Sequence, residues 1–329
     1  MMNYCRISLK PVKSKSKYPH YLDSEFRKLF KSLKVNPALS FARKDFFRQS
    51  TSKSKGLSIS GVQQKLSLKI NSNKELEMTS TEGEYILKPS PEAFPHASEN
   101  EHCAMLTSRM LGIETALCAL ISFSDGELVY ITKRFDRKGD GKIHQEDLVQ
   151  GFGMKSEDKY AYSYEKAGKL INLMANGKAS VVFDFFCRVV HAYIIGNDDL
   201  HLKNISLQKL PENTRLYYDR LAPNYDSLFT NAFDNVSGSG FLALDLLENE
   251  GNGLFSKAYE KYGFYTGYDF KALGNRLGLR EKPVTTFINT VKKKESMLID
   301  LINCSSMPDD MKKKASLMIS ERIKTLGLG

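Results

Sequence analysis

The sequence predicts an α+β protein in which a small antiparallel sheet is followed by a mostly helical region. Short apolar, strand-like runs dominate between residues 65 and 135, whereas apolar residues recur with helical spacing from about Tyr164 onward. The composition changes in a polar stretch after Phe135, which indicates a border between two lobes. We expect three parts: an N-terminal extension (1–55) packing on the first lobe, a sheet-rich lobe (56–136) and a helical lobe (137–329).

Strands and one helix are expected in the first lobe. A hairpin is indicated by the Ser-Asp-Gly turn at residues 124–126, which joins the last two runs. The helix between the earlier and later strands is predicted from a capping box, with Ser98 as the cap and Glu101 three residues later, and from a stop at Gly112. The expected strands are 65–70, 84–89, 117–123 and 127–135.

The second lobe is expected to begin with a polar loop (136–147) and to continue as helices. Its best-defined helix, 180–195, is apolar except for a narrow polar side formed by Asp184, Arg188 and His191. Such a core helix gives the loop that follows it a rigid base. In addition to the helix between the strands of the first lobe, the expected helices of the chain are 24–34, 165–174, 180–195, 256–262, 269–277, 284–302 and 309–326.

The overall composition is that of a globular protein. With 48 Lys and Arg against 38 Asp and Glu the net charge is +10, which favours an anionic partner without specifying a nucleic acid. No apolar run reaches the roughly 20 residues of a membrane helix, and no signal-peptide core is present. Five cysteines without a Cys-x-x-Cys pair fit a reduced setting, so we expect a cytoplasmic protein that does not bind membranes.

Catalytic residue types gather in "GNDDLHLKN" (196–204), directly after the core helix. Asp199 and Asn204 are five residues apart, the spacing of the protein-kinase catalytic loop, where the Asp accepts the substrate hydroxyl's proton and the Asn binds Mg²⁺. Asp and Asn at a fixed separation are also common in turns, so an ordinary polar turn is an open alternative.

Three further features follow the chain order of a kinase. Lys88 ends an apolar strand and could neutralise phosphate oxygens, although an edge-strand lysine would look the same. Asp226 could complete a Mg²⁺ site with Asn204, or could form an Asx turn. The Gly- and Ser-rich segment 56–61 could place backbone N–H groups over phosphates, or be a flexible loop. Together they predict a bilobal protein-kinase-like fold.

The motifs as a set resemble the HipA family of bacterial toxin-antitoxin serine/threonine kinases. The resemblance rests on "SISGVQQKLSL", "YILKP", "NEHCAMLTSRMLG", "KRFDR", "HQEDLVQGFG", "GNDDLHLKN" and "YDSL". The short front end is similar to the compact HipT branch of the family. No Asp-Phe-Gly or Ala-Pro-Glu triplet is present, so the Gly/Ser loop is the expected switch in place of an activation loop.

The resemblance implies a role for each matching residue, with ATP and Mg²⁺ as cofactors. Asp199 would be the catalytic base, Asn204 and Asp226 would bind Mg²⁺, and Lys88 would contact the phosphates of ATP. Further implied positions are Lys133 and Phe135 (backbone contacts to adenine), His201 and Tyr225 (near the phosphates), and Ser58 and Ser60 (autophosphorylation).

The resemblance also implies partners. The substrate would be a translation factor, such as an aminoacyl-tRNA synthetase, and small antitoxin or accessory proteins would restrain the kinase and link it to DNA only indirectly. Two alternatives stay open: a small-molecule phosphotransferase with the same order of lobes, and a DNA-binding corepressor subunit without catalysis, whose DNA affinity would depend steeply on salt.

Overall fold

The computed structural model describes residues 3–12, 15–53, 64–139, 141–234 and 240–328. The chain divides into two compact units, which are described separately. We call the first the sheet unit (Met1–Leu106, Ala116–Phe135 and Leu301–Pro308) and the second the helical unit (Thr107–Thr115, Asp136–Asp300 and Asp309–Gly329). In the described part of the chain, no helix combines the length and the apolar character needed to cross a membrane.

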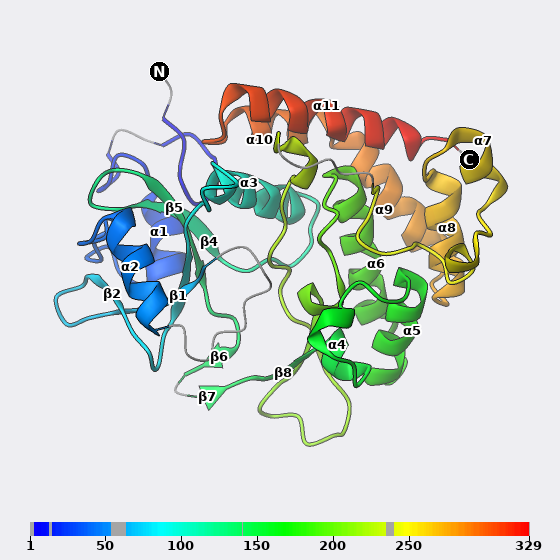
Figure 1. Ribbon diagram of the computed structural model, residues 1–329, viewed down its shortest axis with the longest axis horizontal. Helices are drawn as coiled ribbons and strands as arrows, with labels where there is room; N and C mark the ends of the chain where they lie inside the picture. Colours follow the sequence, from blue (N-terminus) through cyan, green and yellow to red (C-terminus); the bar gives the residue numbers. More distant parts are fainter. Residues whose placement is uncertain (1–2, 13–14, 54–63, 140, 235–239, 329) are drawn as a thin grey trace. The chain divides into compact units, whose positions relative to one another are not determined.

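The sheet unit contains a five-stranded antiparallel sheet, in the order β2-β1-β3-β5-β4. Strands β1, β2, β4 and β5 are labelled in Figure 1. The four predicted strands are all present, and the predicted hairpin is confirmed because Phe123 donates its N–H to Glu127 O at 2.9 Å across the turn. The short β2 escaped prediction because three residues carry little periodicity. The strands are β1 (Leu66–Ile70), β2 (Leu76–Met78), β3 (Tyr85–Lys88), β4 (Cys118–Ser122) and β5 (Leu128–Lys133).

Residues before the sheet supply a large part of its core. Helices α1 (Asp23–Phe30) and α2 (Arg43–Lys53) precede β1. The ring of Phe30 lies 5.5 Å from that of Tyr85 on β3, and Phe26, Phe30 and Phe46 are fully or almost fully buried in one apolar cluster with the inward side chains of the strands. Aromatic burial of this size stabilises the sheet strongly. The predicted domain borders after residues 55 and 136 stay predictions.

Helix α3 (Ala97–Met110) forms where a helix was predicted, but the predicted capping box is wrong. The helix begins at Ala97, so Ser98 lies inside its first turn, where its hydroxyl donates to Lys88 O at 3.0 Å. The N–H of Ser98 donates to Ser90 Oγ at 3.0 Å, and the Glu101 carboxylate pairs with a lysine. Partners distant in sequence therefore replace the local capping contacts.

The helical unit contains most of the remaining helices. The predicted single helix 284–302 is wrong, because it is interrupted at Lys294, whose ammonium donates to the carbonyl of Met110. Helical spacing alone does not reveal a break of one residue. The helices are α4 (Leu148–Gly151), α5 (Tyr164–Met174), α6 (Ala179–Ile194), α7 (Lys257–Tyr262), α8 (Gly267–Arg276), α9 (Glu281–Lys293), α10 (Glu295–Asn303) and α11 (Asp309–Thr325), with 3₁₀ turns at Ser156–Asp158, Leu202–Asn204, Thr230–Ala232 and Glu250–Asn252.

The stretch predicted as a polar loop, 136–147, is partly strand. A short pair, β6 (Arg137–Lys138) and β7 (Gly141–Lys142), precedes β8 (His144–Asp147). Strand β8 pairs with β9 (Ser206–Lys209), which pairs with β10 (Arg220–Leu221), in a three-stranded antiparallel sheet. The polar residues of β8 gave no strand signal because the pairing, rather than an apolar face, forms this strand.

Helix α6 is the core helix of the unit, as predicted, and Arg188 and His191 on its polar side are buried as well. Arg188 is 2% exposed and binds the Asp184 carboxylate with two nitrogens, at 2.7 and 3.3 Å. His191 is 1% exposed and its Nε2 lies 3.0 Å from the hydroxyl of Thr107. Burial lowers the pKa of His191 to about 3, so this imidazole is neutral. These contacts of Arg188 and His191 hold the polar side of α6 in place.

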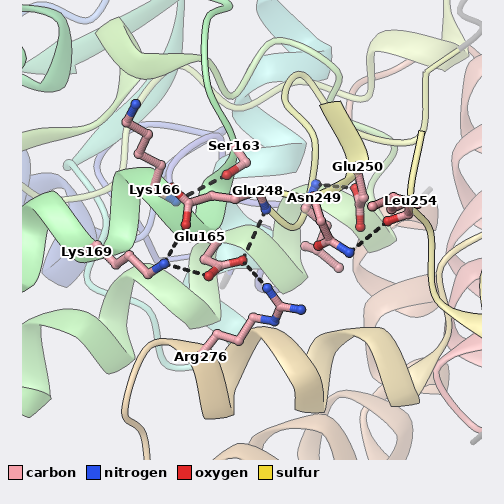
Figure 2. A network of polar contacts seen from close by, with 10 residues as sticks. Ser163, Glu165, Lys166, Lys169, Glu248, Asn249, Glu250, Leu254 and Arg276 are labelled. Atoms are coloured by element: carbon pink, nitrogen blue, oxygen red, sulfur yellow. Dashed lines mark hydrogen bonds and ion pairs between the residues drawn. The ribbon is translucent and has the colours of Figure 1, made fainter. Parts of the chain in front are cut away.

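A carboxylate network holds α5 to the segment before α7 (Figure 2). Glu165 is 3% exposed, and its oxygens accept from Lys169 Nζ at 2.7 Å, Arg276 Nη1 at 3.1 Å and the Glu248 N–H at 3.1 Å. Burial favours the neutral form of Glu165, but these three donors outweigh it and hold the pKa of this carboxyl below its usual value. The ionised form therefore stabilises the fold.

Glu165→Gln is expected to lower the free energy of unfolding by about 2–3 kcal/mol at pH 7. Because the folded pKa is depressed, the stabilisation is complete above the ordinary value of 4.5 and is lost as the pH falls through the folded pKa. Urea unfolding of both proteins between pH 3 and pH 7 measures the difference, with the exposed Glu157→Gln as the control. A difference that stays constant over this range would contradict the assignment.

Candidate active site

The predicted catalytic loop leaves α6 through a left-handed glycine. Gly196 has φ 60°, its N–H donates to Tyr193 O at 3.1 Å, and the Asn197 N–H donates to Ala192 O at 2.8 Å, which is a Schellman motif. A Cβ at Gly196 would overlap Sδ of Met318. Gly196 therefore ends α6 and sets the direction in which the following loop leaves the helix.

Side chains within and beside the loop fix the backbone of Asp198 and Asp199. Asn197 is 1% exposed, and its Oδ1 accepts the Asp199 N–H at 3.1 Å. The Asp198 N–H donates to Thr230 Oγ1 at 3.1 Å, and the Thr230 hydroxyl donates in turn to the carbonyl of Gly196. This arrangement presents the Asp199 side chain, which is 41% exposed, toward solvent.

The two carboxylate oxygens of Asp199 have different surroundings. Oδ1 accepts from the Tyr160 hydroxyl at 2.7 Å and lies 3.5 Å from Nε2 of His201. Oδ2 has no hydrogen bond from the part of the chain that the structure describes. One oxygen is thus engaged by the protein, whereas the other can accept a proton from a bound hydroxyl.

Asn204 lies within hydrogen-bonding reach of the same loop. Its Nδ2 donates to Asp199 O at 2.9 Å, and the turn between them is closed by the His201 N–H on Asp199 O at 2.8 Å and the Asn204 N–H on His201 O at 2.9 Å. Because the amide nitrogen of Asn204 bonds to the loop, its amide oxygen is the atom that can bind a ligand. The five-residue spacing is therefore one compact turn.

Asp226 belongs to the same constellation. It has φ 58°, a left-handed conformation that is uncommon for a residue other than glycine and that is often found at functional sites. Its charge acts on His201, as does that of Asp199. Asn204 and Asp226 together offer an amide oxygen and a carboxylate, the oxygen ligands that Mg²⁺ prefers with few protein ligands, so the donor set fits this ion.

His201 and Tyr225 support this loop. His201 is 1% exposed; burial is the main cause that lowers its pKa, against the opposing effect of Asp199, so the ring is neutral near pH 7. The Tyr225 hydroxyl lies 2.7 Å from Ser206 Oγ and donates to Lys203 O at 3.0 Å. Burial raises the pKa of Tyr225. Their placement near phosphates stays a prediction.

Lys88 forms a buried ion pair in the sheet unit. It ends β3, the middle strand of the sheet, so the alternative of an edge-strand lysine is wrong. Its Nζ lies 2.6 Å from Glu101 Oε1 on α3 and 5.5 Å from the ring centre of Tyr130. The side chains of Lys88 and Glu101 are 6% and 0% exposed. This pair joins the third strand along the chain to the helix that follows it.

The remaining predicted positions give less information. The Lys133 N–H donates to Leu117 O at 2.8 Å and is therefore already engaged. Burial, followed by the charge of Lys31, lowers the pKa of the Lys133 ammonium. Phe135 follows β5. Their adenine contacts stay predictions, and Ser58 and Ser60 lie outside the described residues.

Sequence reasoning missed two polar partners of the site. Glu101 had a signal, a glutamate on the first helix after the lysine strand, but its spacing from Ser98 was interpreted as a cap. Tyr160 had none, because an exposed tyrosine in a polar segment is common and its bond to Asp199 spans 39 residues.

Comparison with known proteins places these features in a family. Residues 57–298 match the family described as HipA-like C-terminal domain, which is most of the chain. The chain belongs to this HipA-like family. The family assignment agrees with the motif resemblance, while membership of the compact HipT branch stays a prediction.

Curated relatives and solved structures extend the comparison. A Haemophilus influenzae protein named "Putative kinase" is 35% identical over 299 residues, covering 86% of this chain and 85% of that protein. "Putative kinase Y4dM" of Sinorhizobium fredii is 31% identical over 220 residues, 61% of this chain and 51% of that protein. The chain thus spans about half the length of the second relative.

Two solved structures share the fold. HipA in the Shewanella oneidensis complex of HipA, HipB and operator DNA gives a TM-score of 0.61 at 19% identity, covering 82% of this chain and 64% of that one. The Helicobacter pylori proinflammatory kinase CtkA gives 0.51 at 16% identity, covering 78% and 92%. The predicted α+β kinase-like fold is therefore confirmed.

Proposed function

We propose that this HipA-like protein is a Mg²⁺- and ATP-dependent serine/threonine protein kinase. The observation that carries the proposal is the buried ion pair of Lys88 and Glu101 on β3 and the helix that follows it. Protein kinases require a β3 lysine paired with a helix glutamate, and a catalytic-loop Asp followed by a metal-binding Asn. Asp199 and Asn204 supply the second requirement. The relatives named as kinases support the same activity.

Each residue then has a defined task. Lys88, oriented by Glu101, would neutralise phosphate oxygens of ATP. Asn204 and Asp226 would hold Mg²⁺, which supplies positive charge to the phosphates when bound. Asp199 would orient the acceptor hydroxyl and take its proton as the new O–P bond forms and ADP leaves. His201, neutral by burial, lies with its Nε2 3.5 Å from Asp199 Oδ1.

We further propose that the kinase is a toxin of a toxin-antitoxin system. The fold neighbour from Shewanella oneidensis is described in complex with HipB and operator DNA, which supports a small antitoxin partner and only an indirect link to DNA. The motif resemblance favours a translation factor, such as an aminoacyl-tRNA synthetase, as substrate. We also propose a cytoplasmic location, which the five cysteines without a Cys-x-x-Cys pair support.

Autophosphorylation of Ser58 or Ser60 is proposed as the switch of the kinase. A phosphoserine adds about 1.5 to 2 negative charges, which would repel the phosphates of ATP if the loop covers them. The modified protein should then bind ATP more weakly than the unmodified one.

Mass spectrometry of the full chain incubated with ATP and Mg²⁺ tests the proposed function. We expect a phosphate-sized mass gain, mapped by peptides to Ser58 or Ser60, that is absent in Asp199→Gln and in the Ser58→Ala/Ser60→Ala variant. A folded wild-type protein that gains no phosphate and binds no ATP would overturn the kinase assignment. Phosphate transfer to a metabolite but never to protein would replace it with a small-molecule phosphotransferase.

A further inference from the structure

Tyr160 contacts the proposed catalytic base directly, although no sequence motif marks it. Its hydroxyl donates to Asp199 Oδ1 at 2.7 Å. The distance is that of a charge-assisted hydrogen bond, which is shorter and stronger than one between neutral groups. Burial is the main cause that raises the pKa of Tyr160, and the bond to Asp199 adds to it. The hydroxyl therefore keeps its proton and remains a donor at neutral pH.

The segment that carries Tyr160 is bound to the catalytic loop on both sides of this residue. The Leu202 N–H donates to Lys159 O at 3.1 Å, and Lys203 Nζ donates to Ser156 Oγ at 2.7 Å. Four residues after Tyr160, the hydroxyl of Tyr164 donates to Leu200 O at 2.8 Å. These bonds hold the segment at a fixed place beside the loop, so the position of Tyr160 relative to Asp199 is fixed by the fold.

The ring of Tyr160 is also held, although the residue is 49% exposed. It meets the His201 ring edge-on, with centroids 5.1 Å apart and an angle of 79° between the planes. Lys159 Nζ lies 4.8 Å from the centre of the ring. The ring contacts both side chains, and the hydroxyl bonds a single carboxylate oxygen.

We propose that Tyr160 is a positioning residue that fixes the orientation of the Asp199 carboxylate for phosphoryl transfer. The terminal torsion of an aspartate is broad and has two nearly equivalent states, so a carboxylate on a loop turns easily. The bond to Oδ1 selects one orientation and leaves Oδ2 to accept the substrate proton. This role rests on the proposed kinase function.

Kinetics of Tyr160→Phe test the proposal, because this change removes only the hydroxyl. Small misplacements of a catalytic group lower the rate strongly, so we expect kcat to fall about 10- to 100-fold while KM for ATP changes less than about twofold. Tyr162→Phe is the matched control, since Tyr162 is 43% exposed, two residues away, and has no hydrogen bond to Asp199. It should keep the wild-type kcat.

Combination with Asp199→Asn separates positioning from a structural effect. If Tyr160 acts through Asp199, adding Tyr160→Phe to Asp199→Asn should change the residual rate less than about twofold, because the group that it orients no longer accepts a proton. A full additional loss in the double variant, a wild-type kcat in Tyr160→Phe, or a change confined to KM would each overturn the positioning role. A folded wild-type protein without phosphoryl transfer would instead overturn the kinase assignment on which the role rests.

Discussion

Asp199→Asn is expected to lower phosphoryl transfer by roughly 100- to 10,000-fold, the range for loss of a general base. The amide has almost the shape of the carboxylate and can still accept the hydrogen bond that Tyr160 donates to Oδ1. It cannot take the proton of an acceptor hydroxyl. The loss should therefore appear in kcat, with the affinity for ATP and the circular dichroism spectrum unchanged. Single-turnover assays with radioactive ATP measure it.

The matched control for this substitution is Asp158→Asn. Asp158 is an exposed carboxylate in the 3₁₀ turn Ser156–Asp158, close in sequence to Tyr160. It should retain the wild-type kcat, which would show that loss of one negative charge near the loop is not the cause. If Asp199→Asn keeps more than about a tenth of the wild-type rate, another group accepts the proton and the assignment of the base is wrong.

Local chemistry explains why the sequence was sufficient to predict the end of α6 and the turn that follows it in the proposed catalytic loop. Apolar residues at helical spacing define α6, Gly196 supplies the left-handed residue that ends it, and Asn197 accepts the N–H of Asp199 two residues later. These interactions lie within about six residues, so the order of residue types contains them. The bonds of the loop to Thr230 and Tyr160 join residues that are distant in sequence, and residue order does not reveal them. The strands of the five-stranded sheet are equally local, since apolar runs bounded by turn residues mark them.

Other features depend on contacts between distant residues, which residue order does not reveal. Ser98 and Glu101 satisfied a local capping pattern, yet Lys88 binds both, through its carbonyl and its ammonium. A buried lysine is costly without an acceptor, so the ion pair outweighs a cap worth about 1 kcal/mol. Tyr160 and β8 follow the same rule, because the hydroxyl bond and the strand pairing each join segments far apart in the chain.

Lys88→Met and Glu101→Leu are each expected to lower the free energy of unfolding by roughly 3–5 kcal/mol, because each removes one partner of a buried ion pair and leaves the other charge in the interior. The double variant should regain most of this stability, since a buried ion pair can be replaced by packed apolar side chains at little net cost. Chemical unfolding of the wild type, the two single variants and the double variant gives a double-mutant cycle. Equal losses that simply add in the double variant would contradict a direct pair at 2.6 Å.

The double variant Lys88→Met/Glu101→Leu should regain stability without regaining phosphoryl transfer. The apolar pair fills the same space between β3 and α3 but offers no ammonium for phosphate oxygens, so the double variant should be folded and at least about 100-fold less active than the wild type. A buried ion pair is weak as a source of stability, and it is explained better by a need for an oriented cation. A stable double variant with wild-type activity would refute this explanation and leave Lys88 as a structural residue.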